Sequence, residues 1–262
     1  MFFEFHIGPE TTMGELLEDW LDITFSVSED CLHLAVYTPY DPTTALAKDT
    51  PKLPIMFFVH GGAFQCGTQL FMDAARLGEV ADVIVVSINY RVGPLGFLCL
   101  DTDEGGGNMG MLDMVLALEW VRDNIAQFGG DKDRITIFGE SAGAASIGHL
   151  VLSNSTTDAN ATTGVRYMYI THQLSLKLKY ITSQGLFAQG IGQSGSAVSP
   201  WAFDTEPVYN SRAVADRLGC DNSTDHTAIV ECLRDKSALQ IMRAFRQHSV
   251  RFSNLVLYPY PQ

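Results

Sequence analysis

The stretch Arg134–Gly143, with the sequence RITIFGESAG, decides the fold. Its first half, Arg134–Phe138, is a β-branched run that predicts a buried strand, and the small apolar residues of Ala142–Leu152 predict a helix packed closely on a sheet. A G-x-S-x-G pattern between a strand and a helix is typical of a sharp, strained turn that exposes a serine hydroxyl. Both glycines are needed because side chains there would collide. We therefore expect Ser141 to be a nucleophile, the alternative being a tight turn with a buried serine.

The segments on either side alternate between strand and helix patterns. Strands are expected over Leu32–Thr38, Pro54–Val59 and Val83–Asn89, and a helix over Asn108–Ile125 with Asn108 as its N-cap. A regular pattern resumes at Gly185–Ile191. Buried strands that alternate with helices predict an α/β fold, with a mostly parallel central sheet and helices on both faces.

A glycine-containing loop, His60–Phe64 (HGGAF), directly follows the expected strand Pro54–Val59. Glycines there allow the backbone to lie close to a substrate with its N–H groups pointing inward, as in oxyanion loops of the H-G-G-G type. The alternative is a flexible β-turn. His60 precedes the glycines, so we expect it to order the loop and not to act as a catalytic base.

Composition limits the classes of function. The 262 residues are 46% hydrophobic and 18% charged, which is ordinary for a globular protein and excludes whole-chain disorder. A formal net charge of -13 repels phosphate backbones, so no nucleic-acid partner is expected. No apolar run reaches the roughly 20 residues of a membrane helix. We expect no metal and no cofactor, and the oligomeric state is left open.

Cysteines and glycosylation sequons favour an oxidising compartment. Cys220 and Cys232 enclose a short polar loop that suits a local disulfide. Sequons begin at Asn154, Asn160 and Asn222. We therefore expect a glycoprotein that is secreted or lies in the endoplasmic-reticulum lumen. No signal peptide is visible at the N-terminus, which suggests that the authentic start lies elsewhere. The state of Cys31, Cys66 and Cys99 is left open.

The chain resembles the type-B carboxylesterase and cholinesterase family of α/β-hydrolases, insect-type esterases in particular. The resemblance covers roughly residues 28–153 and 183–260. The matching blocks are Ser28–Leu32 with Val36–Pro39, His60–Phe64, Asn89–Gly93 with Leu95–Leu98, Gly107–Gly110 with Leu112–Asp113, Phe128–Asp131, Phe138–Ala145, Gln193–Ser196, and Cys220 with Cys232–Arg234.

The resemblance implies a serine hydrolase that cleaves small-molecule carboxylic esters through an acyl-enzyme on Ser141. It also implies an oxyanion hole built from the backbone N–H groups of Gly62, Ala63 and Ala142, although Ala63 stands where many relatives carry a third glycine. Further residues carried over from the family are Glu140 as a buried acidic neighbour of the nucleophile, Ser194 as a hydroxyl near the triad, and Trp201 as an acyl-pocket aromatic. Arg91 and Asp131 resemble a buried ion pair of the family, the alternative being two solvated surface charges.

The family's triad acid and histidine are expected after the Cys220–Cys232 loop, and neither is found before Gln262. His149, His172, His226 and His248 all lie in unsuitable settings. We therefore expect the chain to be the N-terminal portion of a single α/β-hydrolase domain, incomplete at its C-terminal side and inactive alone. A non-catalytic binding or adhesion protein and a truncated or misassembled product are the alternatives. The identity of the ester stays open.

Residues 154–182 interrupt the pattern. The segment is polar, carries two sequons, and then turns into an alternating apolar run. Removing it would restore a short helix-to-strand connection. We expect an anomalous insert, from a retained intron or mispredicted exon; the alternative is a lineage-specific surface loop with glycans on Asn154 and Asn160.

Overall fold

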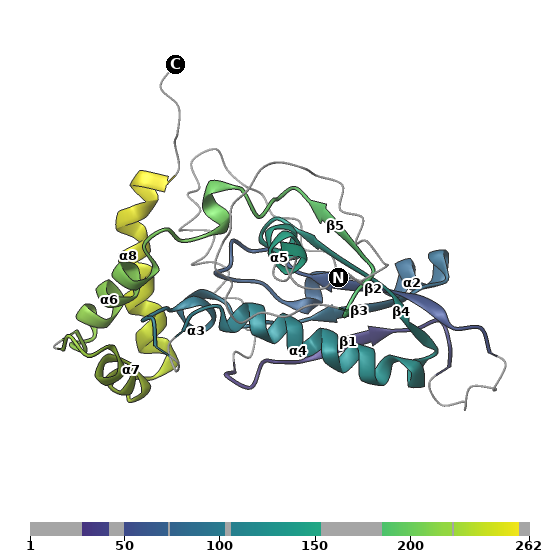
Figure 1. Cartoon of the computed structure of the whole chain (residues 1–262), viewed down its shortest axis with the longest axis horizontal. Helices are drawn as coiled ribbons and strands as arrows, with labels where there is room; N and C mark the ends of the chain where they lie inside the picture. The colour runs from purple at the N-terminus through teal and green to yellow at the C-terminus, as the bar shows by residue number, and fades with distance from the viewer. Residues whose placement is uncertain are drawn as a thin grey trace, which may run out of the picture.

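The computed structural model describes residues 28–41, 50–72, 74–102, 106–152, 185–221 and 223–256, with side chains up to 248. Its centre is a five-stranded sheet in the order β1-β3-β2-β4-β5 (Figure 1). The strands are β1 (Leu34–Tyr37), β2 (Leu53–Val59), β3 (Ile84–Ile88), β4 (Gly130–Glu140) and β5 (Gln189–Gln193). β1 runs antiparallel to β3, and all the other pairs are parallel. The predicted mostly parallel sheet is confirmed.

The register brings the ends of three parallel strands to one edge of the sheet. Val59 at the end of β2 pairs with Gly139 in β4, and Gly139 pairs in turn with Gly192 in β5. Because parallel strands point the same way, the residues after β2, β4 and β5 emerge side by side. These are the His60–Phe64 loop, Ser141 and the Ser194–Gly195 turn. The carboxyl edge of the sheet therefore collects the segments that the sequence singled out.

Helices cover both faces of the sheet, as the alternation predicts. The helices are α2 (Ala75–Ala81), α3 (Gly93–Phe97), α4 (Met109–Asn124), α5 (Ala142–Leu152), α6 (Pro207–Arg217), α7 (His226–Arg234) and α8 (Ala238–Val256), with 3₁₀ turns η1 (Gln69–Phe71), η2 (Ile125–Phe128) and η3 (Pro200–Ala202). Figure 1 shows α6, α7 and α8 gathered beyond one end of the sheet, next to α3. No helix in the described ranges is long and apolar enough to cross a membrane.

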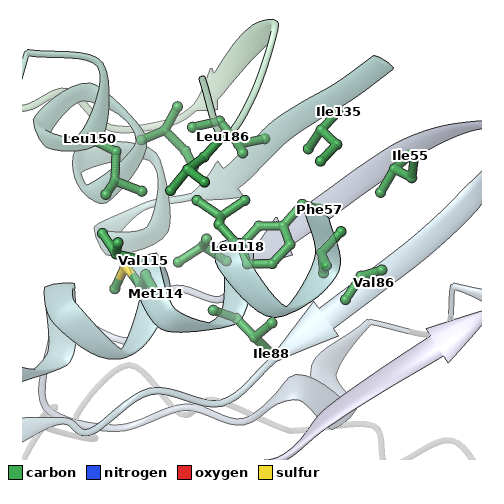
Figure 2. Packing of buried hydrophobic residues seen from close by; sticks show 14 of the residues in the cluster. Ile55, Phe57, Val86, Ile88, Met114, Val115, Leu118, Ile135, Leu150 and Leu186 are labelled. Atoms are coloured by element: carbon green, nitrogen blue, oxygen red, sulfur yellow. The ribbon is translucent and has the colours of Figure 1, made fainter. Parts of the chain in front are cut away.

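Alternate residues of each central strand enter two separate apolar layers. Ile55 and Phe57 face one layer, where α4 contributes Leu118 and α5 contributes Leu150 (Figure 2). Phe58, the residue after Phe57, faces the opposite layer with Phe138 of β4 and Leu77 of α2. The larger layer fixes α5 on the sheet, so the first residue of that helix cannot move independently of β4.

Two element boundaries differ in detail from the expectation. Asn108 does occupy the N-cap position of α4, but with φ 61° and with no hydrogen bond from its side chain to the helix. Asparagine tolerates this left-handed backbone better than most residues, so its role here is conformational. Strand β4 begins at Gly130, four residues before the expected run.

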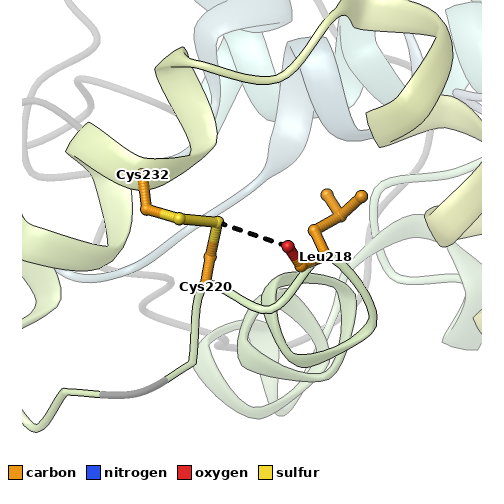
Figure 3. The surroundings of a disulfide bond; sticks show 3 residues. All are labelled: Leu218, Cys220 and Cys232. Atoms are coloured by element: carbon orange, nitrogen blue, oxygen red, sulfur yellow. Dashed lines mark hydrogen bonds between the residues drawn. A yellow bond between two sulfur atoms is a disulfide. The ribbon is translucent and has the colours of Figure 1, made fainter.

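The predicted disulfide is confirmed. Cys220, after α6, is bonded to Cys232 in α7, with 5.6 Å between their Cα atoms (Figure 3). The Leu218 carbonyl oxygen lies 3.9 Å from the Cys220 sulfur. Around the bond, a small apolar cluster separate from the two sheet layers includes Ile229 and Leu233. Cys31, Cys66 and Cys99 are free thiols.

The suspected insert 154–182 lies outside the described residues, as do His172, Asn154, Asn160 and Asn222. The assignment of residues 1–262 to one domain stays a prediction.

Candidate active site

Ser141 sits on the sharp turn between β4 and α5 that the sequence predicts. Its φ is 55°, a left-handed backbone that few non-glycine residues adopt. Its N–H donates to the Gln193 carbonyl oxygen at 2.8 Å, and its carbonyl accepts from the Ala145 N–H at 3.0 Å. The residue is half-buried. The strained backbone is therefore held from both sides, by β5 and by the first turn of the helix.

The glycines beside Ser141 are explained by crowding. A Cβ on Gly143 would lie 2.1 Å from the Val59 carbonyl oxygen and 2.9 Å from that of His60. A Cβ on Gly139 would lie 2.8 Å from the same Val59 oxygen. The end of β2 thus passes directly under the turn, and only glycine leaves room for it.

The His60–Phe64 loop lies against this turn. A Cβ on Gly61 would come 3.1 Å from the Cβ of Ser141. The next three residues all have positive φ, 111° at Gly62, 54° at Ala63 and 61° at Phe64. Alanine pays a steric cost at such an angle that glycine avoids, which is a physical reason for the third glycine of the H-G-G-G pattern.

Three backbone N–H groups in this turn and in the adjacent loop have no acceptor in the described part of the chain. Those of Gly62, Ala63 and Ala142 donate no hydrogen bond to any described residue. Ala142 is the first residue of α5, where an N–H has no acceptor within the helix. The arrangement can stabilise negative charge on an oxygen near Ser141. Its role as an oxyanion hole stays a prediction.

His60 behaves as a structural residue of the loop. It is 1% exposed, and its Nδ1 lies 2.8 Å from the Gly61 carbonyl oxygen. Burial lowers the pKa of its imidazole. A neutral ring already engaged with its own loop fits the expectation that His60 orders the backbone.

The segment after β5 contacts the nucleophile through a residue that sequence reasoning missed. A Cβ on Gly195 would lie 2.2 Å from the Ser141 carbonyl oxygen. Ser194, beside it, is exposed and has φ 56°. The sequence offered only the block Gln193–Ser196 as a signal, without the contact itself.

Glu140 is not buried, so the burial expected from the family resemblance is wrong for this structure. Its side chain is exposed at the end of β4, next to Gln193 of the outer strand β5. One carboxylate oxygen would still lie 2.8 Å from a Cβ on Gly61, so the group borders the loop. Its charge is therefore close to the turn but well solvated, which weakens its influence on the site.

Trp201 lies in η3 and is 44% exposed. The turn is tied to α5, because His149 Nε2 lies 3.0 Å from the Ala202 carbonyl oxygen. His149 is itself 7% exposed, and burial lowers the pKa of its imidazole. Whether Trp201 lines an acyl pocket stays a prediction.

The other two described histidines after Ser141 form hydrogen bonds away from it. His226 contacts the Leu100 carbonyl oxygen through Nδ1, and His248 Nε2 lies 3.2 Å from Asn210 Oδ1. Within the described ranges, no histidine is bonded to Ser141.

The expected ion pair between Arg91 and Asp131 is wrong. Arg91 binds Asp113 through two side-chain hydrogen bonds, each 2.8 Å long, and through its backbone N–H at 3.0 Å. Asp131 instead pairs with Arg134, three residues along β4, at the protein surface. The Arg134 guanidinium holds the pKa of the Asp131 carboxyl below its usual range. The buried acid that anchors Arg91 comes from α4.

Comparison with known sequences identifies the family. The chain matches the Carboxylesterase family over residues 8–163 and 172–260. It belongs to the carboxylesterase family. The unmatched residues 164–171 fall within the suspected insert.

The similar proteins include both neuroligins and an esterase. Neuroligin-2 of Mus musculus is 38% identical over 229 residues, which cover 82% of this chain and 24% of that protein. Neuroligin-3 of Mus musculus is 37% identical over 232 residues, covering 82% and 25%. Cocaine esterase of Homo sapiens is 39% identical over 217 residues, covering 83% and 33%. The chain thus spans about a quarter to a third of the length of these relatives.

Proposed function

We propose that this carboxylesterase-family chain carries the nucleophile and oxyanion hole of a serine hydrolase that cleaves carboxylic esters of small molecules. One observation carries the proposal: Ser141 is held at φ 55° against the His60–Phe64 loop, and three backbone N–H groups of this turn and loop have no partner in the described part of the chain. A strained backbone that exposes a hydroxyl to unpaired donors is costly, and catalysis explains its presence.

In this reaction the Ser141 hydroxyl oxygen attacks the ester carbonyl carbon. The negative charge that develops on the carbonyl oxygen is stabilised by the N–H groups of Gly62, Ala63 and Ala142. The bond to the alkoxy oxygen then breaks, and the alcohol leaves with the proton that Ser141 released. Water attacks the acyl-Ser141 intermediate and releases the carboxylic acid. The proton transfers require a general base, for which the family resemblance implies a histidine oriented by an acidic residue.

The test is covalent labelling of the natural protein with a fluorophosphonate, which reacts with activated serines. We expect stoichiometric labelling that Ser141→Ala abolishes. Ser237→Ala, at an exposed serine before α8, is the matched control and should label normally. Labelling that survives Ser141→Ala would refute the nucleophile assignment.

A non-catalytic binding or adhesion function is the second candidate. The neuroligin names state no ester cleavage, whereas the name of cocaine esterase does. The two candidates differ in what happens when Ser141 is replaced by alanine. A binding protein should keep all its activity after that change, while an esterase should lose about 10³-fold or more in kcat.

We also propose an oxidising compartment, either the secretory lumen or the extracellular space. The Cys220–Cys232 bond supports this, since structural disulfides persist where thiols are not kept reduced. Glycosidase treatment followed by mass spectrometry of peptides with the three sequons tests the proposal. Unmodified asparagines at all three sequons would count against it.

A further inference from the structure

Two aromatic residues behind the oxyanion loop form a buried pair that the proposed reaction does not use directly. The Tyr90 hydroxyl donates a hydrogen bond of 2.8 Å to the His60 carbonyl oxygen. Its ring stacks on the His60 imidazole, with 4.2 Å between centroids and 16° between planes. Tyr90 is 3% exposed and His60 is 1% exposed. Tyr90 therefore holds both the backbone and the ring of His60.

The hydrogen bond of His60 to its own loop determines where the ring proton lies. A carbonyl oxygen only accepts, so Nδ1 must carry the hydrogen that it donates to the Gly61 oxygen. Nε2 is then an unprotonated nitrogen, buried and without a partner among the described residues. Glycine at position 67 leaves room for this ring, since a Cβ there would lie 2.2 Å from Nδ1. The imidazole is thus fixed in one orientation and one tautomer.

This bond also sets the direction of a candidate oxyanion-hole donor. In a trans peptide, the C=O and the N–H of the same plane point in opposite directions. The Gly61 carbonyl shares its plane with the Gly62 N–H. Because His60 Nδ1 holds the Gly61 carbonyl oxygen toward the imidazole ring, the Gly62 N–H points away from that ring. The next plane is held in the same way, because the Gly62 oxygen accepts from the N–H groups of Gln65 and Cys66 at 2.9 and 3.1 Å.

We propose that Tyr90 and His60 are positioning residues that aim the Gly62 N–H at the oxyanion formed on the Ser141 adduct. Tyr90 fixes His60, His60 fixes the Gly61 carbonyl, and that carbonyl fixes the Gly62 N–H. The proposal rests on the proposed esterase function for its kinetic consequence. Its structural part, the orientation of one peptide plane, is independent of catalysis.

The test compares Tyr90→Phe with Tyr40→Phe in the natural protein. Tyr90→Phe removes the hydroxyl and keeps the ring that stacks on His60. Tyr40→Phe is a matched control, because the Tyr40 hydroxyl also donates to a backbone carbonyl, that of Pro51 at 2.6 Å, in an exposed part of the chain.

For Tyr90→Phe we expect kcat for a p-nitrophenyl ester to fall by about tenfold to a hundredfold, with KM changed less than about twofold. The affinity for a trifluoromethyl ketone, which forms an oxyanion adduct with the nucleophile, should fall by a similar factor. Tyr40→Phe should leave both values unchanged. A Tyr90→Phe variant that loses thermal stability but keeps kcat would overturn the proposal, as would an effect on KM alone.

A second measurement separates this proposal from the esterase function itself. The amide ¹⁵N and ¹H shifts of Gly62 in glycine-labelled protein report the orientation of its peptide plane without any reaction. We expect them to move in Tyr90→Phe and to stay in place in Tyr40→Phe. If Ser141 is unreactive in the unaltered protein, the proposed function fails, but the positioning proposal is still decided by these shifts. An unmoved Gly62 amide overturns it.

Discussion

Gly195 lies directly against Ser141, with space between them for a hydrogen but not for a methyl group. A Cβ on Gly195 would be 2.2 Å from the Ser141 carbonyl oxygen, 3.0 Å from its carbonyl carbon and 3.1 Å from the Cβ of Ala144. The same segment accepts the Ser141 N–H through Gln193. The turn after β5 therefore supports the strained turn after β4, so a substitution in one turn should disturb the backbone of the other.

Gly195→Ala is expected to damage the candidate nucleophile without touching its side chain. The methyl group must displace the backbone of Ser141, because the atoms it meets are not the far end of a flexible side chain. Overpacking of this kind costs about 1–3 kcal/mol in free energy of unfolding. We expect the fluorophosphonate labelling rate to fall by about tenfold or more, since a small misplacement of a reacting group is enough.

The matched control for Gly195→Ala is Gly185→Ala. Gly185 precedes β5, and a Cβ there would meet no atom within 4 Å, although its φ is 71°. The control should lose about 1 kcal/mol from backbone strain and keep its labelling rate. Equal labelling rates in the two variants would show that the contact with Ser141 does not matter.

The pairing of Arg91 with Asp113 leads to a second prediction. Asp113→Asn keeps the shape of the side chain but removes the charge that Arg91 binds. The Asp113 side chain is 5% exposed, whereas that of Arg91 is 40% exposed, so solvent stabilises the remaining guanidinium in part. We expect a loss of about 2 kcal/mol in free energy of unfolding by urea denaturation.

Asp131→Asn is the control for this pair. Its salt bridge with Arg134 is at the surface, and such pairs contribute about 0–1 kcal/mol. A larger loss from Asp131→Asn than from Asp113→Asn would contradict the prediction that the Arg91–Asp113 pair contributes more to stability.

The sequence predicted the turn at Ser141 and the preceding loop well because their constraints are local. Two glycines at fixed spacing, a β-branched run before them and small residues after them are enough to define a strand, a turn and a helix. The His60–Phe64 loop follows the same logic. Its left-handed backbone needs small residues, and those residues are adjacent in the chain.

The contacts that the sequence did not predict all join distant segments. Both α4 and β4 contain several acidic residues that could pair with Arg91. The packing of α4 on the sheet is what brings Asp113 to Arg91. The approach of Gly195 to Ser141 depends on the β4–β5 register. The exposure of Glu140 depends on what covers the end of β4, and no local pattern reports that.

Buried neutral histidines predict a loss of stability in mild acid. The pKa of the imidazole is lowered by burial at His60 and at His149. In the unfolded chain the same groups titrate near about 6.5 and bind protons that the folded chain does not. The unfolded state therefore binds more protons below that pH, and the free energy of unfolding falls as the pH drops from about 7 toward 5.

Urea denaturation at a series of pH values measures this dependence. His149→Gln keeps a side-chain N–H for the Ala202 carbonyl and cannot titrate, so its stability should fall less steeply with acid. His33→Gln, at an exposed histidine, is the control and should keep the slope of the unaltered protein. A stability that rises between pH 7 and 5 would contradict the prediction.

The Cys220–Cys232 bond should stabilise the α6–α7 region in particular. The two cysteines are 12 residues apart, and closing a loop of this size in the unfolded chain is worth about 3 kcal/mol. The double variant Cys220→Ala with Cys232→Ala should lose about that amount in urea denaturation and should become insensitive to reductant. Cys99→Ala, at a half-buried free thiol, is the control: it should keep the stability of the unaltered protein and should still lose stability on reduction, because its disulfide is intact. Hydrogen exchange shows which part of the chain is affected. Ile229 and Leu233 pack around the bond in a cluster separate from the sheet. In the double variant, amides of α7 should therefore exchange faster, while those of α5 stay protected. Uniform loss of protection across the sheet would show that the bond stabilises the whole fold and not this region.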